Sequence, residues 1–308
     1  MGIDPYSSVM VACLAVITLE ATTGIFMNLF ILIVILQKFQ KEKSTRPGDK
    51  IRAASIVSNI FLTLVLIPSA FGQIFLFRVY RILSIVLNLL ALYSISSSLY
   101  LTAVFSFFLF IKIVQFKSDI LGWAKRKVAL VIPLLVVAVE VFSFCSSFLI
   151  LLFFDINGGA HTNSSAALTD DGNRGGSLDG QMLALTLGLF LVPYFIMAMT
   201  TISAAGSLMV HSYKMKKTGT VNTEAYKKSV YRMMVFFTFH TIFSFVSCLV
   251  YSPGLTGPWF WTVLTFLHLL SPAHSLYIIY SKPKLRNAWK MMIDCIFCRK
   301  TLVQAEGT

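Results

Sequence analysis

The sequence predicts an all-α membrane protein that crosses the bilayer seven times. Of its 308 residues, 56% are hydrophobic and only 13% are charged, and the mean hydropathy is +0.77. A soluble domain carries about 25% charged residues, and a soluble fold of this length has too little interior for so many apolar side chains. A helix needs about 20 apolar residues to cross a bilayer core, and stretches of that length recur along the chain.

Seven such stretches are present. The predicted spans cover about residues 9–37, 51–77, 82–111, 128–154, 181–211, 233–251 and 259–281. Four of them contain a proline, which a membrane helix tolerates because neighbouring helices satisfy the freed backbone groups; these are Pro68, Pro133, Pro193 and Pro272. We expect residues 1–285 to form one seven-helix domain, followed by an amphipathic helix and tail over residues 286–308.

The basic residues predict the orientation of the bundle. The segments after the first, third and fifth spans, together with the tail, hold all 26 Lys and Arg except Arg78, Arg81 and Arg174. Short cytoplasmic loops retain Lys and Arg, so we expect an extracellular N-terminus and a cytoplasmic C-terminus. Topology and contact with anionic membrane lipid explain the net charge of +13, and no nucleic-acid partner is needed.

The long loop over residues 155–180 lies on the predicted outer side. It contains the sequon Asn163-Ser164-Ser165, which predicts N-glycosylation, with chance occurrence as the alternative. It contains no cysteine, which excludes a disulfide from this loop to the third span. Cys295 and Cys298 lie in the basic tail with no second pair of ligands, so we expect no metal and no cofactor. Palmitoylation and plain reduced thiols remain the two alternatives for this pair.

Two spans carry acidic residues. Glu20, Gly24 and Asn28 are spaced by four in the first span and share one helix face. A carboxyl exposed to lipid is costly, so this face is predicted to point into the bundle, as a packing seam or as a ligand contact. Glu140, near the middle of the fourth span, receives no interpretation from the sequence.

Four segments carry a recurrent set of residues: Glu20 to Asn28, Ser106 to Phe116, Leu191 to Lys217, and Pro272 to Leu285. Together they resemble the type 2 (bitter) taste receptors. That family shows E-x-x-x-G-x-x-x-N in helix one, F-x-F-L-K-I-A-N-F at the inner end of helix three, L-x-P-F then H-x-x-x-M around helix five, and H-S-x-x-L-I-x-x-N-x-K-L at the end of helix seven. The matching residues are Glu20, Gly24, Asn28, Lys112, Ile113, Phe116, Pro193, His211, Met215, His274, Ser275, Lys284 and Leu285.

The chain departs from this pattern at four positions. Asn59 stands where the family has an Arg in helix two, and Tyr100 stands at a usual Trp of helix three. Ile95 replaces a usual pocket Asn, and Lys282 replaces the Asn of helix seven. These departures indicate a divergent, non-mammalian member.

The resemblance implies a seven-transmembrane-helix G-protein-coupled receptor that detects bitter small molecules in an outer transmembrane cavity. It also implies coupling to a heterotrimeric G protein of the gustducin or inhibitory class. The residues expected to line the cavity are Asn88, Leu92, Ile95, Ser96, Leu185, Thr186, Phe243, Ser247, Leu264 and Leu267. Those expected to face the G protein are Lys112, Gln115, His211, Lys214, Met215, Lys216, Lys217 and Lys284, whose lysines have topogenic charge as the alternative role.

Three other classes of protein fit the sequence less well. A type 1 vomeronasal (pheromone) receptor has a similar length, but the His274-Ser275 pair favours the taste receptors. His274 and Ser275 are also consistent with a simple interhelical hydrogen bond. A seven-span transporter usually shows internal repeats, and none is convincing here. An enzyme is not expected, because the sequence contains no hydrolase, metalloprotease or phosphate-binding motif.

Overall fold

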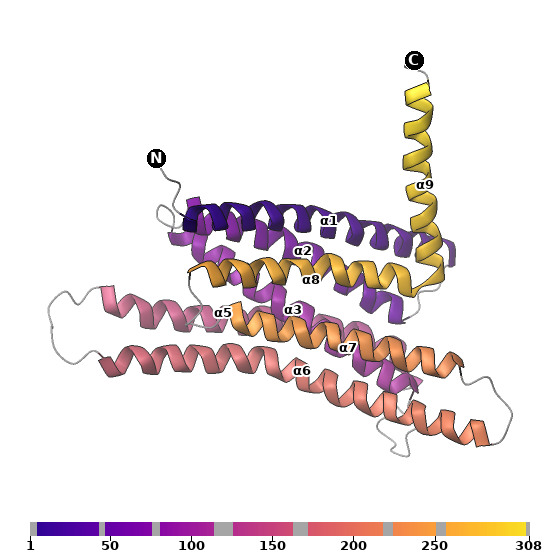
Figure 1. Ribbon diagram of the computed structural model, residues 1–308. Helices are drawn as coiled ribbons and strands as arrows, with labels where there is room; N and C mark the ends of the chain where they lie inside the picture. The colour runs from indigo at the N-terminus through magenta and orange to yellow at the C-terminus, as the bar shows by residue number, and fades with distance from the viewer. Residues whose placement is uncertain are drawn as a thin grey trace.

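The computed structural model describes residues 5–42, 47–75, 81–113, 126–162, 172–217, 224–250 and 257–305, and its regular elements are all helices (Figure 1). These helices are α1 (Pro5–Glu42), α2 (Pro47–Phe75), α3 (Arg81–Ile113), α5 (Val128–Thr162), α6 (Gly172–Lys217), α7 (Glu224–Val250), α8 (Gly257–Ser281) and α9 (Pro283–Ala305). The first seven lie along a common direction as an up-and-down bundle.

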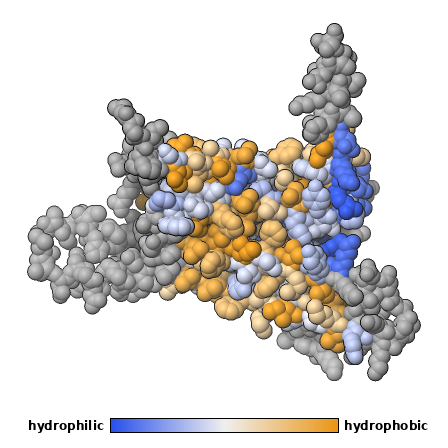
Figure 2. Space-filling model, in the orientation of Figure 1, coloured by the Kyte–Doolittle hydropathy of each residue, from blue (hydrophilic) through white to orange (hydrophobic). Residues whose placement is uncertain are grey.

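Seven helices are long and apolar enough to cross a membrane, which confirms the predicted all-α fold with seven spans. Their apolar stretches are Ser8–Lys41, Pro47–Gly72, Ile85–Ile113, Val128–Leu152, Ala184–Val210, Val230–Val250 and Gly257–Ser281. Pro68, Pro133, Pro193 and Pro272 each lie inside one of these helices. The surface of the bundle in Figure 2 is largely apolar between its two ends, as a lipid-facing surface must be.

Helix α3 is the centre of the bundle. It packs against α2, α5, α6 and α7, and 78% of its spanning stretch is buried, against 11% for α5. Ser94, Ser96, Ser97 and Ser98 are all buried on α3, and such small side chains let neighbouring helices approach closely. The outer face of α5 is instead covered by exposed aliphatic side chains such as Leu134, 71% exposed.

Helix α8 is held in place by α1 through the face that carries the Glu20, Gly24 and Asn28 motif. A Cβ at Gly24 would lie 3.4 Å from Cδ of Pro272, so the glycine permits close contact with α8. Asn28 is buried, its Nδ2 donates to the carbonyl of Gly24 at 2.9 Å, and Oγ of Ser275 donates to its Oδ1 at 3.0 Å. This part of the motif lies in a packing seam.

Helix α9 leaves the bundle crosswise in Figure 1. Pro283 begins it, a position where the missing N–H costs nothing. Leu285 is buried in a cluster with Ile31, and the ring of Trp289 packs edge-on against Phe30 with 5.1 Å between centroids. We use the term α9 end for the end of the bundle where α1, α3, α6 and α8 terminate and α9 begins.

Candidate functional site

A cavity of about 240 Å³ lies between α2, α3, α7 and α8 and reaches the α9 end, and we call it the α9-end cavity. Its walls are mainly apolar, with Ile56, Phe105 and Phe236 among them, while Arg52, Arg232 and Lys282 supply positive charge. Apolar walls with a few convergent polar groups are typical of ligand and partner sites between helices.

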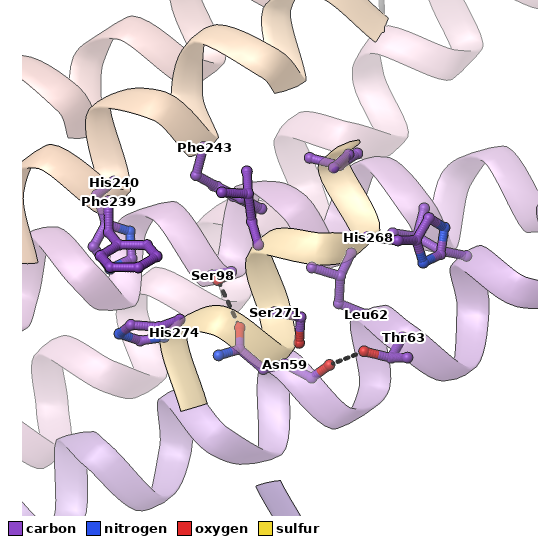
Figure 3. A pocket seen from close by; sticks show the side chains of 13 residues that line it. Asn59, Leu62, Thr63, Ser98, Phe239, His240, Phe243, His268, Ser271 and His274 are labelled. Atoms are coloured by element: carbon purple, nitrogen blue, oxygen red, sulfur yellow. Dashed lines mark hydrogen bonds between the residues drawn. The ribbon is translucent and has the colours of Figure 1, made fainter. Parts of the chain in front are cut away.

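A smaller central cavity of about 30 Å³ lies deeper in the bundle, between α2, α3, α7 and α8 (Figure 3). This volume is on the order of two water molecules. Asn59, Ser98, His240 and His274 line both cavities, so the two are neighbours along the bundle axis. The four side chains come from four different helices and form the polar boundary between the two spaces.

Asn59 joins α2 to α3 at this boundary. Its Oδ1 accepts a hydrogen bond from Oγ of Ser98 at 2.9 Å, and its carbonyl accepts one from Oγ1 of Thr63 at 2.9 Å, as Figure 3 draws. Asn59 is 9% exposed, and the oxygen of its side-chain amide is satisfied by Ser98. The residue therefore fixes the polar side of the cavity wall in place.

His240 and His274 join α7 to α8. Their rings meet edge to face with centroids 5.1 Å apart, and Phe236 packs on His240 at 4.6 Å. Both ring nitrogens of His240, Nε2 of His274, Nε2 of His268 and Oγ of Ser271 have no hydrogen-bond partner among the described residues. All four residues line the central cavity. Leaving a buried polar atom unpaired costs about 1–3 kcal/mol, so a polar group bound here would be stabilised.

A bond at the α9 end also joins α7 to α8. The hydroxyl of Tyr277 donates to the carbonyl of Arg232 at 2.9 Å, and the Tyr277 ring lies 5.9 Å from the Phe239 ring. Both Tyr277 and Arg232 line the α9-end cavity. The bond therefore opposes separation of α7 from α8 at the α9 end.

Glu140, which the sequence left without interpretation, accepts hydrogen bonds from hydroxyl groups between α3 and α5. The hydroxyl of Tyr93 donates to its Oε2 at 2.7 Å, and Oγ of Ser97 lies 2.9 and 3.0 Å from the two carboxyl oxygens. Ser97 in turn bonds Ser58 of α2 at 3.0 Å. The cluster links three helices without contributing to either cavity.

The residues predicted to line a ligand cavity lie in several places. Phe243 and Leu267 line the central cavity, and Leu92 and Ile95 belong to the hydrophobic cluster around it. Ser96 faces α5, 3.2 Å from Oγ of Ser147. The remaining five residues divide as follows: Leu264 packs with Leu14 of α1, Thr186 and Ser247 are buried, and Asn88 and Leu185 are exposed.

Of the residues predicted to face a G protein, Lys112 and Lys284 are exposed at the α9 end. Gln115 lies outside the described residues, as does the sequon Asn163. The backbone of the last turns of α6 carries His211, Lys214, Met215, Lys216 and Lys217 to the same end, while their side chains lie outside the described part. Cys295 is exposed and not in a disulfide; the side chain of Cys298 also lies outside that part.

Sequence reasoning missed His240, His268 and Tyr277. A signal for the histidines was present, because an ionisable side chain inside a predicted span usually faces the bundle interior. His240 also lies four residues after Phe236 and three before Phe243, on one helix face. Tyr277 offered no such signal, because its partner is a backbone carbonyl on another helix.

Seven helices of membrane-spanning length, packed around a cavity that reaches one end of the bundle, form a heptahelical fold like that of the G-protein-coupled receptors. The chain matches the family model described as "Taste receptor protein (TAS2R)" over residues 6–296. It is 26% identical over 281 residues to "Taste receptor type 2 member 4" of Pan troglodytes, a match that covers 88% of this chain and 92% of that relative. The proteins of the same name from Gorilla gorilla gorilla and Homo sapiens match with the same identity and coverage. The chain therefore belongs to the type 2 taste receptor family.

Membership confirms the resemblance seen in the four sequence segments. It makes the protein a multi-pass receptor of the plasma membrane, in the class of bitter taste receptors rather than of enzymes. It also favours the taste receptors over the vomeronasal receptors and the transporters.

Proposed function

We propose that the protein binds bitter small molecules between its helices and activates a heterotrimeric G protein of the gustducin or inhibitory class at the α9 end. The observation that carries the proposal is the pair of neighbouring cavities that share Asn59, Ser98, His240 and His274. A group bound in the central cavity contacts the same side chains that line the α9-end cavity. Binding at one is thereby coupled to the shape of the other.

The proposed orientation places the N-terminus outside the cell and the α9 end in the cytoplasm. Lys112, Arg126 and Lys284 lie exposed at the α9 end, and Figure 2 shows hydrophilic residues gathered where α9 leaves the bundle. The cationic end of a bundle faces the cytoplasm because positive loops are retained there. An agonist then enters from the opposite end and reaches the central cavity past Phe243 and Leu267.

To activate the receptor, an agonist must shift the equilibrium between its inactive and active states. A ligand that binds both states equally changes nothing, and a space of about 30 Å³ is far smaller than a drug-sized ligand site of about 300 Å³ or more. We infer that agonists bind a state in which α7 and α8 lie farther apart at Phe243. The mostly apolar surroundings favour amphipathic molecules held by a few polar contacts.

The test is calcium release in cells that express this chain with a gustducin-type chimeric α subunit, screened against bitter compounds. We expect a dose-dependent signal that mock-transfected cells lack. For a compound that gives this signal, Phe243→Ala is expected to lower potency about tenfold, because Phe243 is a partly buried aromatic at the proposed ligand contact and loss of such a contact costs on the order of 1.4 kcal/mol.

Phe245→Ala is the matched control, because Phe245 lies on the same helix, is 64% exposed and lines neither cavity. Equal dose–response curves for wild type and Phe243→Ala, at equal surface expression, would contradict the site. Silence of the wild-type receptor across coupling partners, despite confirmed surface expression, would contradict the function.

A further inference from the structure

A second cavity at the α9 end, of about 580 Å³, lies outside the two cavities used above, and we call it the basic pocket. It is formed where α1 ends, α2 begins, α3 ends and α5 begins, with Lys282 contributed by the junction of α8 and α9. Ligand sites of this kind enclose about 300–1,000 Å³, so the volume suits a headgroup of moderate size.

The charge of the basic pocket is strongly positive. Lys38, Arg52, Lys112 and Lys282 line it together with a single acidic residue, Asp49, a net charge of +3. Asp49 accepts from Nζ of Lys38 at 2.6 Å and from Nη2 of Arg52 at 2.8 Å. Lys112 and Lys282 have no ion-pair partner within the described ranges. One carboxylate thus serves two cations, and two further cations are available to an anion.

The frame around these cations is fixed by packing. Nε of Arg52 donates to the carbonyl of Gly48 at 2.9 Å, and its guanidinium lies 5.9 Å from the centroid of the Phe105 ring. A Cβ at Gly48 would lie 2.9 Å from Cε1 of Phe108, so only glycine lets α2 begin this close to α3. The pocket is therefore built before any ligand arrives.

The wall next to the cations is apolar. Phe108, Ile111 and Val128 line the pocket at the ends of membrane-spanning helices. A basic surface beside an apolar wall at this depth suits a lipid whose headgroup is anionic and whose chains enter the bilayer. A net charge of +3 favours a headgroup with several phosphate charges over one with a single charge.

We propose that the basic pocket binds the phosphorylated headgroup of an inositol lipid. This inference rests on the orientation in the proposed function, which places the pocket in the cytoplasmic leaflet. The bound headgroup joins the ends of α1, α2 and α3 to Lys282. Arg52 and Lys282 also line the α9-end cavity, so the lipid contacts two residues that border the proposed G-protein site.

Binding is measured on the purified receptor, without G protein or agonist, by native mass spectrometry with dioctanoyl phosphatidylinositol bisphosphate. We expect binding at least tenfold tighter than that of dioctanoyl phosphatidylserine. The double variant Lys112→Gln, Lys282→Gln is expected to lose about tenfold or more in affinity, because each cation near such a surface contributes measurably to binding. Lys50→Gln is the control, because Lys50 is exposed on α2 and does not line the pocket.

Soluble inositol trisphosphate separates the two sources of the same phosphate chemistry. If inositol trisphosphate binds at least tenfold more weakly than the lipid, contact of the lipid chains with the apolar wall is supported. If the two bind equally, the assignment to a lipid is wrong. The proposed site is wrong if wild type and double variant bind the inositol lipid with equal affinity. It is also wrong if the wild-type receptor binds the inositol lipid and phosphatidylserine equally well. Failure of agonist signalling leaves this measurement unaffected, so the proposed function and the lipid site fail separately.

Discussion

Asn28 shows how one buried amide can fix two membrane helices relative to each other. The side chain is 1% exposed, bonds its own helix through Gly24, and accepts from Ser275 of α8. In the membrane interior water does not replace a lost partner, so each group depends on the other. Its role is to keep α8, and with it His268 and His274, in register with the cavities.

Replacement of Ser275 by alanine tests this role. Removal of the hydroxyl leaves Oδ1 of Asn28 without its interhelical donor, and such bonds contribute about 0.6 kcal/mol on average, up to about 1.7. We expect the thermal midpoint of the purified receptor to fall by a few degrees. Thr238→Ala serves as the control, because Thr238 is exposed and bonds only its own helix. An equal fall in both variants would refute the claim.

Tyr277 carries a functional prediction. Tyr277→Phe keeps the ring beside Phe239 and removes only the bond to the carbonyl of Arg232. That bond stabilises the closed arrangement of α7 and α8 by about 0.5–1.5 kcal/mol, so its loss raises the fraction of open receptor up to about tenfold. We expect a higher agonist-independent signal in the cell assay.

The control for Tyr277 is Tyr280→Phe, on the same helix and 56% exposed. It removes the same atom from a residue that lines neither cavity. If basal signalling of Tyr277→Phe equals that of the control, the α7–α8 bond does not hold the receptor closed.

Among the elements, α2 and α3 depend on close approach at the α9 end. Gly48→Ala would place a Cβ 2.9 Å from Phe108, whose ring is 8% exposed and has little room to move. Overpacking of this kind costs about 1–3 kcal/mol. We expect a lower thermal midpoint for the purified receptor and weaker inositol-lipid binding.

Gly206→Ala is the control for Gly48→Ala, because it makes the same substitution at a position where the added methyl group has room. Nothing lies within 4 Å of a Cβ at Gly206 in α6, and alanine favours a helix over glycine by about 1 kcal/mol. We expect an unchanged or higher midpoint. Equal midpoints for Gly48→Ala and wild type would show that α2 shifts without cost.

The helices also show what the sequence could and could not predict. Length and hydropathy identified all seven spans, because a bilayer demands a run of apolar residues whatever the tertiary contacts. Periodicity placed Gly24 and Asn28 on one face. The sequence could not show that Gly48 lies against Phe108, or that Tyr93 and Ser97 donate hydrogen bonds to Glu140. These contacts depend on how different helices are rotated against one another.

For the whole molecule, the sequence likewise predicts which helices carry cavity residues but not which side chains face a cavity. The sequence pointed to Phe243 and Leu267, which line the central cavity, but gave Ser96 and Leu264 the same role, and these residues face α5 and α1. A resemblance identifies positions along a helix, whereas the direction of each side chain follows from packing. The basic pocket was missed entirely, because its cations come from segments far apart in the sequence.

The distribution of charge over the whole chain yields the last prediction. Lys216→Glu, Lys217→Glu is expected to reduce agonist-stimulated G-protein activation about tenfold or more, because repulsion replaces attraction at the proposed contact. The orientation of the receptor should stay unchanged, because most of the 26 Lys and Arg remain on the same side of the membrane. An N-terminal epitope should therefore stay accessible on intact cells, and a C-terminal epitope should need permeabilisation. Normal coupling in a correctly oriented double variant would reduce these lysines to a topogenic role, whereas an inverted receptor would show that so few charges decide the topology.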